Sequence, residues 1–489
     1  MKTSRFVMIL MPPLAALVAC QAGFAQVTPY AVMPTAAPGH TRPFIWRMGA
    51  PVGPSPAAAI GPSDCNSNTY YAFTFCPSAL QSIYAAPPGD LGSGSARYGA
   101  VTIAIVDAYY YANVVADLQT FNTAMNLPQF DGSAQHPDDP TLTIVGCEST
   151  TGIPPSYGVS CGPPGGAGTS SVPGWELETM LDIEYAHAMA PHANILLVEA
   201  LSDGMLDQFA SVYYASQKAD IVSNSWGGPE FFGQGFYDST FNQGAPILFA
   251  SGDHGYITQT GKTTYEIGPE YPCTSPAVTC VGGTTLLPIS SLSGWRRSTE
   301  TAWSCTSLNS CFYYGGSGGG CSAQEALPIY QRYTTSLGGA SGGLPTLCGS
   351  WRAVPDIAAD ANPNTGVLIY DSGNGGYLQV GGTSLACPLM AGVFAQVIYQ
   401  RLVFGNHVTG LGSLNPALYA GEPPYPSRFK GAAVRNYPYF FFDIVSGTNF
   451  GYNAGPGYDL VTGLGVPIFA AQANNFFGLF LVGPPPVVD

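Results

Sequence analysis

The sequence predicts an α/β fold with a mostly parallel central sheet and helices on both faces. Short apolar runs recur from about residue 98, and most are followed by turn residues and a helix-like stretch. That alternation is typical of β-α-β units, whose strands pair in parallel. In such sheets the ligand cleft lies at the carboxyl ends of the strands. The runs expected to form strands are 101–106, 195–198, 221–225, 246–250, 278–281 and 367–370.

The composition narrows the classes of partner. Only 9% of the 489 residues are charged, and 15 basic residues stand against 30 acidic ones, which gives a net charge of −15. This balance argues against nucleic-acid and anionic-membrane partners. No apolar run after residue 30 is long enough to span a membrane. Sparse charge also favours tolerance of acid, because few salt bridges break when carboxylates are protonated.

The N-terminus resembles an export signal. Lys2 and Arg5 precede the apolar run 6–19, and a small-x-small cleavage site ends at Ala25. The residues up to Cys20 also resemble a lipoprotein box, so a lipid anchor on Cys20 is the alternative to a freely secreted protein. Residues 26–64, rich in Pro and Ala, are predicted to form a flexible arm. Further along, 65–480 is predicted to be one folded domain and 481–489 a tail.

Apart from Cys20, the chain has eleven cysteines, and ten of them form five pairs of close neighbours in the sequence. Such pairs are typical of disulfides, which fit an oxidising compartment. Spacing alone leaves the connectivity open and shows no zinc-binding pattern. Cys387 has no neighbour and is interpreted as a small buried hydrophobic residue. The plausible bridges are 65–76, 147–161, 273–280, 305–311 and 321–348.

Ser384 is the candidate nucleophile. A strand-like run, 377–380, leads into two glycines, and a helix-patterned run, 389–402, follows. Ser384 is therefore expected on a strand-to-helix turn, where its hydroxyl can project into a cleft and helix N-terminal amides can bind developing negative charge. Pro388 leaves the Ser384 carbonyl without its usual helical partner. A serine that only caps a Gly-rich turn is the alternative.

Glu178 and Asp182 are four residues apart, which places both carboxylates on one helix face. Close carboxylates repel each other, so the pKa of one rises and the pair can share a proton in acid, as a general acid/base requires. A solvated acidic helix face is the alternative. Asp253 follows the apolar run 246–250 and is expected at the cleft edge as a turn residue, a metal ligand or, when protonated, a donor to an oxyanion.

Together these motifs resemble the sedolisin family, the serine-carboxyl peptidases with a subtilisin-like fold. The family pattern has Glu-xxx-Asp, Ser-Gly-Asp and Gly-Thr-Ser-xxx-Pro segments in that order. Further matches are 222–227, 317–322 and 352–357, and the resemblance extends from about Tyr98 to Ala471. It implies a secreted, acid-acting endopeptidase that is a monomer and takes peptides or proteins as substrates. A non-catalytic secreted peptide-binding or surface protein that retains the fold is the alternative.

The resemblance also assigns roles. Ser384 attacks the peptide carbonyl, Glu178 takes its proton, Asp182 tunes Glu178, and protonated Asp253 holds the oxyanion together with the Ser384 amide. By the same analogy, the substrate backbone is expected to pair with Trp226, Gly227, Ser317, Gly318 and Gly319.

A structural calcium site near the C-terminus is implied as well, in the place where the family binds one Ca²⁺. Carboxylates and turn carbonyls are oxygen ligands of the kind that Ca²⁺ prefers. The implied ligands are the side chains of Asp443 and Asp459 and the carbonyls of Ile444, Gly455 and Gly457.

Two features depart from simple expectations. Asp107 ends an apolar run, so an alternative hypothesis is that it orients His187 as the catalytic base, although no histidine stands in a His-Gly-Thr motif.

Family members usually carry a long N-terminal prodomain, and the residues between the signal and the catalytic region are too few for one. The alternatives are unaided folding, a separately made prodomain, or a chain whose activity has drifted.

Overall fold

The computed structural model describes residues 29–31, 39–48, 60–69, 72–84, 101–131, 139–151, 158–164, 172, 174–259, 265–291, 294–304, 315–332, 344–404, 412–420 and 441–468. The predicted signal peptide, Cys20 and the 481–489 tail lie outside these residues. None of the described helices combines the length and the apolar character that a membrane crossing requires.

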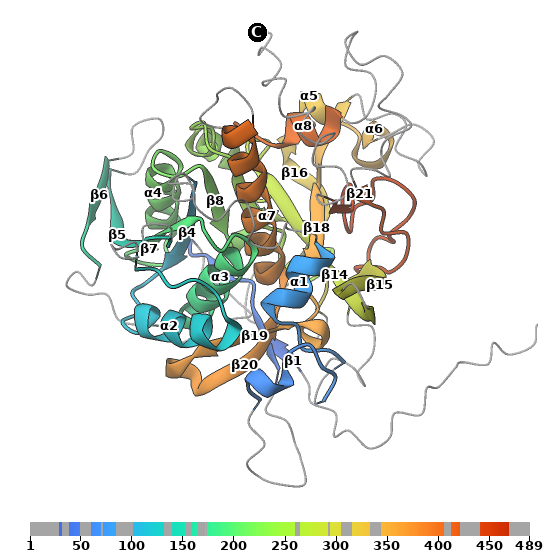
Figure 1. Ribbon diagram of the computed structural model, residues 1–489. Coiled ribbons are helices and arrows are strands. Elements are labelled where there is room, and N and C mark those ends of the chain that lie inside the picture. The colour runs from blue at the N-terminus through green and yellow to red at the C-terminus, as the bar shows by residue number, and fades with distance from the viewer. Residues whose placement is uncertain are drawn as a thin grey trace, which may run out of the picture.

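A nine-stranded sheet forms the centre of the molecule, in the order β15-β14-β10-β8-β4-β7-β5-β6 with β18 also paired to β14 (Figure 1). All its pairings are parallel except those of the edge strands β15 and β6. Five of the six predicted runs lie in this sheet, which confirms the fold class. Its strands are β4 (Thr102–Ala108), β5 (Leu142–Thr151), β6 (Gly158–Gly162), β7 (Asn194–Ala200), β8 (Ile221–Asn224), β10 (Ile247–Ala250), β14 (Thr279–Ser291), β15 (Gly294–Ala302) and β18 (Ile357–Asp360).

The sixth run, 367–370, was wrongly assigned to the parallel sheet. It forms β19 (Val367–Asp371), which pairs antiparallel with β20 (Gly376–Gly381) in a separate sheet of order β1-β3-β20-β19. Only residues 372–375 separate the two strands. A connection this short closes a hairpin, whereas a parallel pair needs a crossover of about a dozen residues or more.

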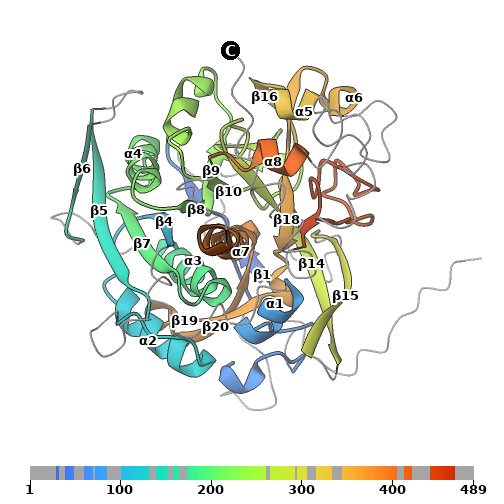
Figure 2. The same cartoon turned by 45° about the horizontal axis from the view of Figure 1, so that its top comes forward.

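Helices cover both faces of the central sheet, as predicted. α3 (Trp175–Met189) and α7 (Thr383–Phe404) pack together on one face, and α4 (Met205–Ser216) lies on the other (Figure 2). Alternate side chains of β4 explain this: Ile105 joins the core cluster of α3 and α7, and Val106 joins that of α4. The predicted helix 389–402 begins earlier than expected, at Thr383.

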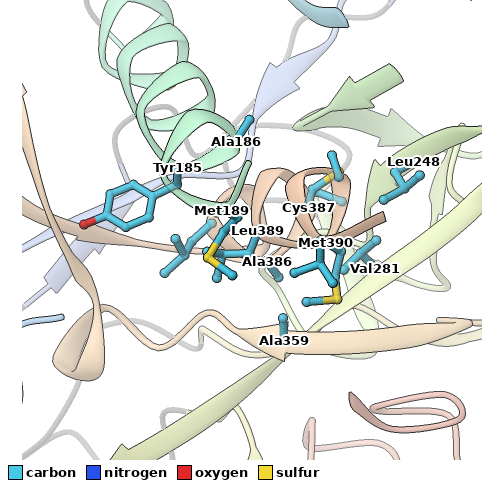
Figure 3. Close-up of a cluster of buried hydrophobic side chains, with 14 of the residues drawn as sticks. Tyr185, Ala186, Met189, Leu248, Val281, Ala359, Ala386, Cys387, Leu389 and Met390 are labelled. Atoms are coloured by element: carbon cyan, nitrogen blue, oxygen red, sulfur yellow. The ribbon is translucent and has the colours of Figure 1, made fainter. Parts of the chain in front are cut away.

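α7 is enclosed by protein along most of its length. Figure 3 shows Ala386 and Leu389 beside Tyr185 and Met189 of α3, while the opposite side of α7 faces Leu248 and Val281 of the sheet. A helix that is apolar all round belongs in a core. The N-terminus of α7 is thereby held rigidly, and with it the turn that carries Ser384.

Part of the predicted flexible arm belongs instead to the folded domain. β2 (Arg42–Pro43) pairs with β9 (Trp226–Pro229), and β3 (Trp46–Met48) pairs with β20. The apolar residues 44–46 are buried. The free energy gained by burying them favours an ordered structure, although the surrounding stretch is rich in Pro and Ala. The arm prediction is therefore wrong for residues 39–48.

Four of the predicted disulfides are present: Cys65–Cys76, Cys147–Cys161, Cys273–Cys280 and Cys321–Cys348. The predicted bridge 305–311 lies outside the described residues. Cys387 is free and buried, as predicted. The other elements are β1 (Pro29–Ala31), α1 (Pro77–Ile83), α2 (Val114–Met125), β11 (Ile257–Gln259), β12 (Tyr265–Ile267), β13 (Glu270–Tyr271), β16 (Gly320–Ala326), α5 (Ile329–Arg332), α6 (Leu344–Cys348), β17 (Trp351–Val354), α8 (Asn415–Ala420), β21 (Phe441–Phe442) and β22 (Val466–Pro467).

Candidate active site

Ser384 lies in the first turn of α7, directly after β20, on the strand-to-helix turn that the sequence predicts. It is buried, and its Oγ donates a hydrogen bond to the carbonyl of Ser225 at 3.1 Å. The Ser384 carbonyl, which Pro388 leaves without a helical N–H, accepts from Ser225 Oγ at 3.3 Å. Gly382 makes the turn possible, because its φ of +111° is a conformation that side chains disfavour.

Glu178 and Asp182 are both fully buried on α3, so the alternative of a solvated acidic face is wrong. Ser225 Oγ donates to Asp182 Oδ1 at 2.8 Å and thereby links this carboxylate to the turn of Ser384. Burial raises the pKa of Glu178 well above its usual value, and the neighbouring charges of Asp182 and Asp107 raise it further. The Ser384 side chain acts in the opposite direction, since it stabilises the ionised carboxylate.

Asp107 is a third carboxyl group of the same cluster, at the end of β4. Burial raises its pKa to about 7, and its charge in turn raises the pKa of both Glu178 and Asp182. The sequence suggested Asp107 only as a partner of His187. That reading is wrong: His187 Nε2 lies 3.0 Å from the carbonyl of Pro128, and burial lowers the pKa of this histidine to about 3.

Asp253 lies just after β10, at the carboxyl end of the strand, as predicted. Its Oδ1 accepts hydrogen bonds from Thr383 N at 2.8 Å and Thr383 Oγ1 at 2.7 Å. Its Oδ2 is buried without a hydrogen-bond partner among the described residues. Burial is the main cause that raises the pKa of Asp253 to about 7. A protonated Asp253 therefore has an O–H to donate beside the turn of Ser384.

Trp226 and Gly227 lie in β9 beside this cluster, and a segment of the chain itself pairs with them. Pro43 stands opposite Trp226, and the Phe44 N–H donates to the carbonyl of Ser225 at 3.1 Å. The Ser384 N–H, which the resemblance assigns to an oxyanion, donates to the carbonyl of Phe44 at 3.2 Å. A peptide carbonyl thus occupies the position between the serine amide and Asp253.

Ser317, Gly318 and Gly319 lie behind the turn of Asp253. The Ser317 hydroxyl donates to the carbonyl of Val461 at 2.7 Å, and Gly318 N donates to the carbonyl of Gly252 at 2.7 Å. The Gly318 contact braces the 251–254 turn, and Ser317 is fully buried. The substrate-pairing role of these three residues stays a prediction.

The implied calcium ligands lie in one loop region. Both Asp443 carboxylate oxygens accept from Gly457 N, at 2.9 and 3.1 Å, and Asp459 Oδ2 accepts from Gly455 N at 3.1 Å. Burial raises the pKa of Asp459 to about 7, which a nearby cation would offset. The described residues contain no group of three or more His, Cys, Asp or Glu side chains that could hold a metal. Two carboxylates beside backbone carbonyls are oxygen donors of the kind that a hard cation such as Ca²⁺ takes.

Comparison with known proteins agrees with this arrangement. The profile of the Subtilase family matches residues 166–404. Kumamolisin from Bacillus sp. (strain MN-32) is 35% identical over 309 residues, which cover 60% of this chain and 49% of kumamolisin. Sedolisin from Pseudomonas sp. (strain 101) is 34% identical over 248 residues, covering 48% of this chain and 36% of that protein. Tripeptidyl-peptidase sed1 from Aspergillus fumigatus is 30% identical over 270 residues, with coverage of 48% and 36%.

The chain thus spans half or less of the length of these curated relatives. A solved structure of Pseudomonas sedolisin in complex with two molecules of pseudo-iodotyrostatin matches with a TM-score of 0.59 and 23% identity, covering 83% of this chain and 98% of that chain. This likeness supports the fold. The relatives and the buried Ser384, Glu178, Asp182 and Asp253 point the same way: the chain is similar to the sedolisin family of subtilisin-like serine-carboxyl peptidases.

Proposed function

We propose that this protein is a serine-carboxyl peptidase that hydrolyses peptide bonds in acid through an acyl-enzyme on Ser384. The observation that carries the proposal is the convergence of Ser384, the Glu178–Asp182 pair and Asp253 around one peptide carbonyl, that of Phe44. A nucleophile, a proton acceptor and oxyanion donors around one carbonyl are the components of acyl transfer.

In the proposed reaction the Ser384 Oγ attacks the carbonyl carbon, and its proton passes to Glu178. Asp182 holds part of the negative charge of the pair and is itself held by Ser225. The developing oxyanion accepts hydrogen bonds from the Ser384 N–H and from protonated Asp253. Glu178 then protonates the leaving amine, and water hydrolyses the ester by the same steps in reverse.

Endopeptidase action is favoured by the direction of the chain in the cleft. Residues 40–43 are held on one side of the Phe44 carbonyl, and residues 45–48 continue on the other. The chain therefore runs past the Phe44 carbonyl in both directions, and more than three residues lie before the Phe44–Ile45 bond. The similarity to tripeptidyl-peptidase sed1 makes removal of three-residue units the alternative, which would require a site that is closed three residues before the attacked bond.

The pH profile is the first test of this function. Asp253 keeps its proton below its raised pKa of about 7 and loses it as the pH rises through that value, which places an anion against the oxyanion. We therefore expect cleavage of denatured serum albumin to be fastest in acid and to fall about 10-fold or more between pH 5 and pH 8. A neutral or alkaline optimum would contradict the proposed mechanism.

A secreted peptide-binding protein with the same fold remains the second candidate. The segment bound in the cleft is the observation that favours it, since binding alone explains that contact. The cleavage assay separates the two, because a binding protein leaves albumin intact at every pH from 3 to 8. Export is part of both proposals, and the four disulfides fit an oxidising compartment.

We also propose one structural Ca²⁺ on Asp443, Asp459 and the carbonyls of Ile444, Gly455 and Gly457. When bound, the ion would neutralise the two carboxylates and tie the 454–459 loop to the end of β21. Chelation with EDTA is expected to lower the midpoint of thermal unfolding by roughly 5 °C or more, and excess Ca²⁺ should restore it. The Asp443→Asn variant should lose this response. Equal midpoints for wild type with and without EDTA would exclude the site.

A further inference from the structure

The two carboxyl oxygens of Asp253 lie in different surroundings. Oδ1 accepts two hydrogen bonds from Thr383, one from the backbone N at 2.8 Å and one from the hydroxyl Oγ1 at 2.7 Å. Oδ2 is buried and has no hydrogen-bond partner within the described part of the chain. Thr383 therefore directs two donors to the same oxygen and leaves the other one open.

The direction of the Thr383 hydroxyl follows from its neighbours. Gly252 N donates to Thr383 Oγ1 at 3.1 Å, so this oxygen already serves as an acceptor. A hydroxyl has a single proton to donate, and here that proton goes to Asp253 Oδ1. A proton on Oδ1 would displace this hydrogen bond, whereas Oδ2 takes a proton without breaking any contact.

Oδ2 also lies on the side of the reacting carbonyl. A Cβ placed on Gly382 would be 2.7 Å from Asp253 Oδ2 and 2.1 Å from the carbonyl oxygen of Phe44, so both oxygens border the same glycine. The Ser384 N–H donates to that carbonyl oxygen at 3.2 Å. A proton on Oδ2 is therefore placed beside the other oxyanion donor, and a proton on Oδ1 would lie on the side of Thr383.

We propose that Thr383 is a positioning residue, which fixes the acidic proton of Asp253 on Oδ2 and thereby aims it at the oxyanion. The inference rests on the proposed peptidase function. It adds Thr383 to the two oxyanion donors, Asp253 and the Ser384 amide, that the resemblance names. Thr383 acts through Asp253 and takes no proton itself.

The Thr383 hydroxyl has a second effect, on the pH at which Asp253 ionises. Burial raises the pKa of Asp253 to about 7, and the hydrogen bonds from Thr383 oppose this rise because they stabilise the carboxylate. Loss of the hydroxyl should therefore raise the pKa further, so that Asp253 keeps its proton to higher pH. One substitution then predicts two results of opposite sign: a lower rate, because the proton is no longer confined to Oδ2, and activity that extends to higher pH.

The other titratable and charged groups that face Asp253 stay in place when this hydroxyl is removed. Arg42 in β2 acts against the effect of burial on the pKa of Asp253, and Glu270 in β13 adds to it. Glu178 on α3 faces it as well, since the charge of Asp253 is the smallest of the causes, after burial and the other carboxylates, that raise the pKa of Glu178. Burial lowers the pKa of His254, the next residue, to about 3.

The test is the rate of cleavage of denatured albumin from pH 3 to 9 for wild type, Thr383→Val and Thr383→Ser. Valine keeps the shape of threonine, including the methyl group near Gly283, and lacks only the hydroxyl. We expect its kcat/KM at pH 4 to fall about 10-fold or more. Its upper pH limit, where the rate falls to half of its maximum, should rise by about half a pH unit or more. Serine restores the hydroxyl, and that variant should stay within about threefold of wild type and keep the wild-type limit.

Thr365→Val is the matched control. Thr365 is also a buried threonine, and its hydroxyl donates to a buried carboxylate, Asp360 Oδ1, at 3.1 Å. This variant should stay within about twofold of wild type at every pH. Should Thr383→Val unfold, its thermal midpoint shows this. Thr383→Cys, whose S–H is a weak donor, then takes its place and should change the rate and the limit in the same directions.

A double variant shows whether Thr383 acts through Asp253. Asp253→Ala leaves no carboxyl proton to orient, so adding Thr383→Val to it should change the rate by less than about twofold. If the two losses multiply instead, or if Thr383→Val is slower with an unchanged upper limit, the positioning proposal is wrong and the peptidase function stands. If wild type itself leaves albumin intact at every pH, both are wrong.

Discussion

Replacing Ser384 with alanine is expected to slow the cleavage of denatured albumin at acid pH by about 10⁵-fold or more. The variant loses the atom that attacks the carbonyl, and neighbouring hydroxyls have other partners. Ser225 Oγ donates to Asp182 and the Ser384 carbonyl, and Thr383 Oγ1 donates to Asp253. The measurement is the initial rate at pH 4, with the same preparation checked for its thermal midpoint.

The fold should tolerate this change. Ser384 Oγ donates to the Ser225 carbonyl, which also accepts from the Phe44 N–H, and the Ser384 side chain stabilises the Glu178 carboxylate. The loss should therefore cost about 1 kcal/mol of unfolding free energy. Ser211→Ala is the matched control, since Ser211 is a buried helical serine on the far face of the sheet. Full cleavage by Ser384→Ala, or equal losses in both variants, would remove Ser384 from the mechanism.

Asp253 should show the second large effect, with opposite results for two replacements. Asp253→Ala removes a donor to the oxyanion and should lower kcat by about 10²- to 10³-fold. Asp253→Asn keeps an acceptor at the place of Oδ1, where both bonds from Thr383 arrive, and can put an N–H donor at the place of Oδ2. The asparagine variant should therefore retain most of the activity that alanine loses.

The pH profile makes this comparison decisive. In wild type, ionisation of Asp253 near pH 7 ends activity, whereas an amide has no proton to lose in this range. Asp253→Asn should therefore stay active to higher pH than wild type. Rates measured from pH 3 to 9 with a peptide substrate give the result. An asparagine variant as inactive as alanine, or one that keeps the wild-type limit near neutral pH, would show that Asp253 acts in another way.

The buried carboxylates also explain why this fold suits acid. Asp107, Glu178, Asp182 and Asp253 all have raised pKa values, with burial as the largest cause. Groups whose pKa is raised on folding stabilise the folded chain at low pH and lose that contribution as the pH rises through the folded value. For Asp107 and Asp253, that window lies between about pH 4 and about pH 7. The destabilisation that comes from burying these carboxyl groups is therefore smallest in acid, where the site is expected to work.

The sequence by itself predicted the local framework. The strand, two glycines and helix around Ser384 follow from short-range patterns, and so do the Glu178–Asp182 spacing and the position of Asp253 after β10. Such features depend on hydrogen bonds and side-chain periodicity within a few residues, which a single stretch of sequence encodes. The sheet and four disulfides between close cysteines were predictable for the same reason.

Only the tertiary structure decided which distant residues meet. Asp107 joins the carboxylates because β4 lies beside the helix that carries Glu178, and His187 points away to Pro128. Phe44 reaches Ser384 across more than three hundred residues through strand pairing with β9 and β20, which no local pattern in a Pro- and Ala-rich stretch reveals. Contacts of this kind depend on strand register and on packing throughout the core. Many residues together determine them, so no single motif predicts them.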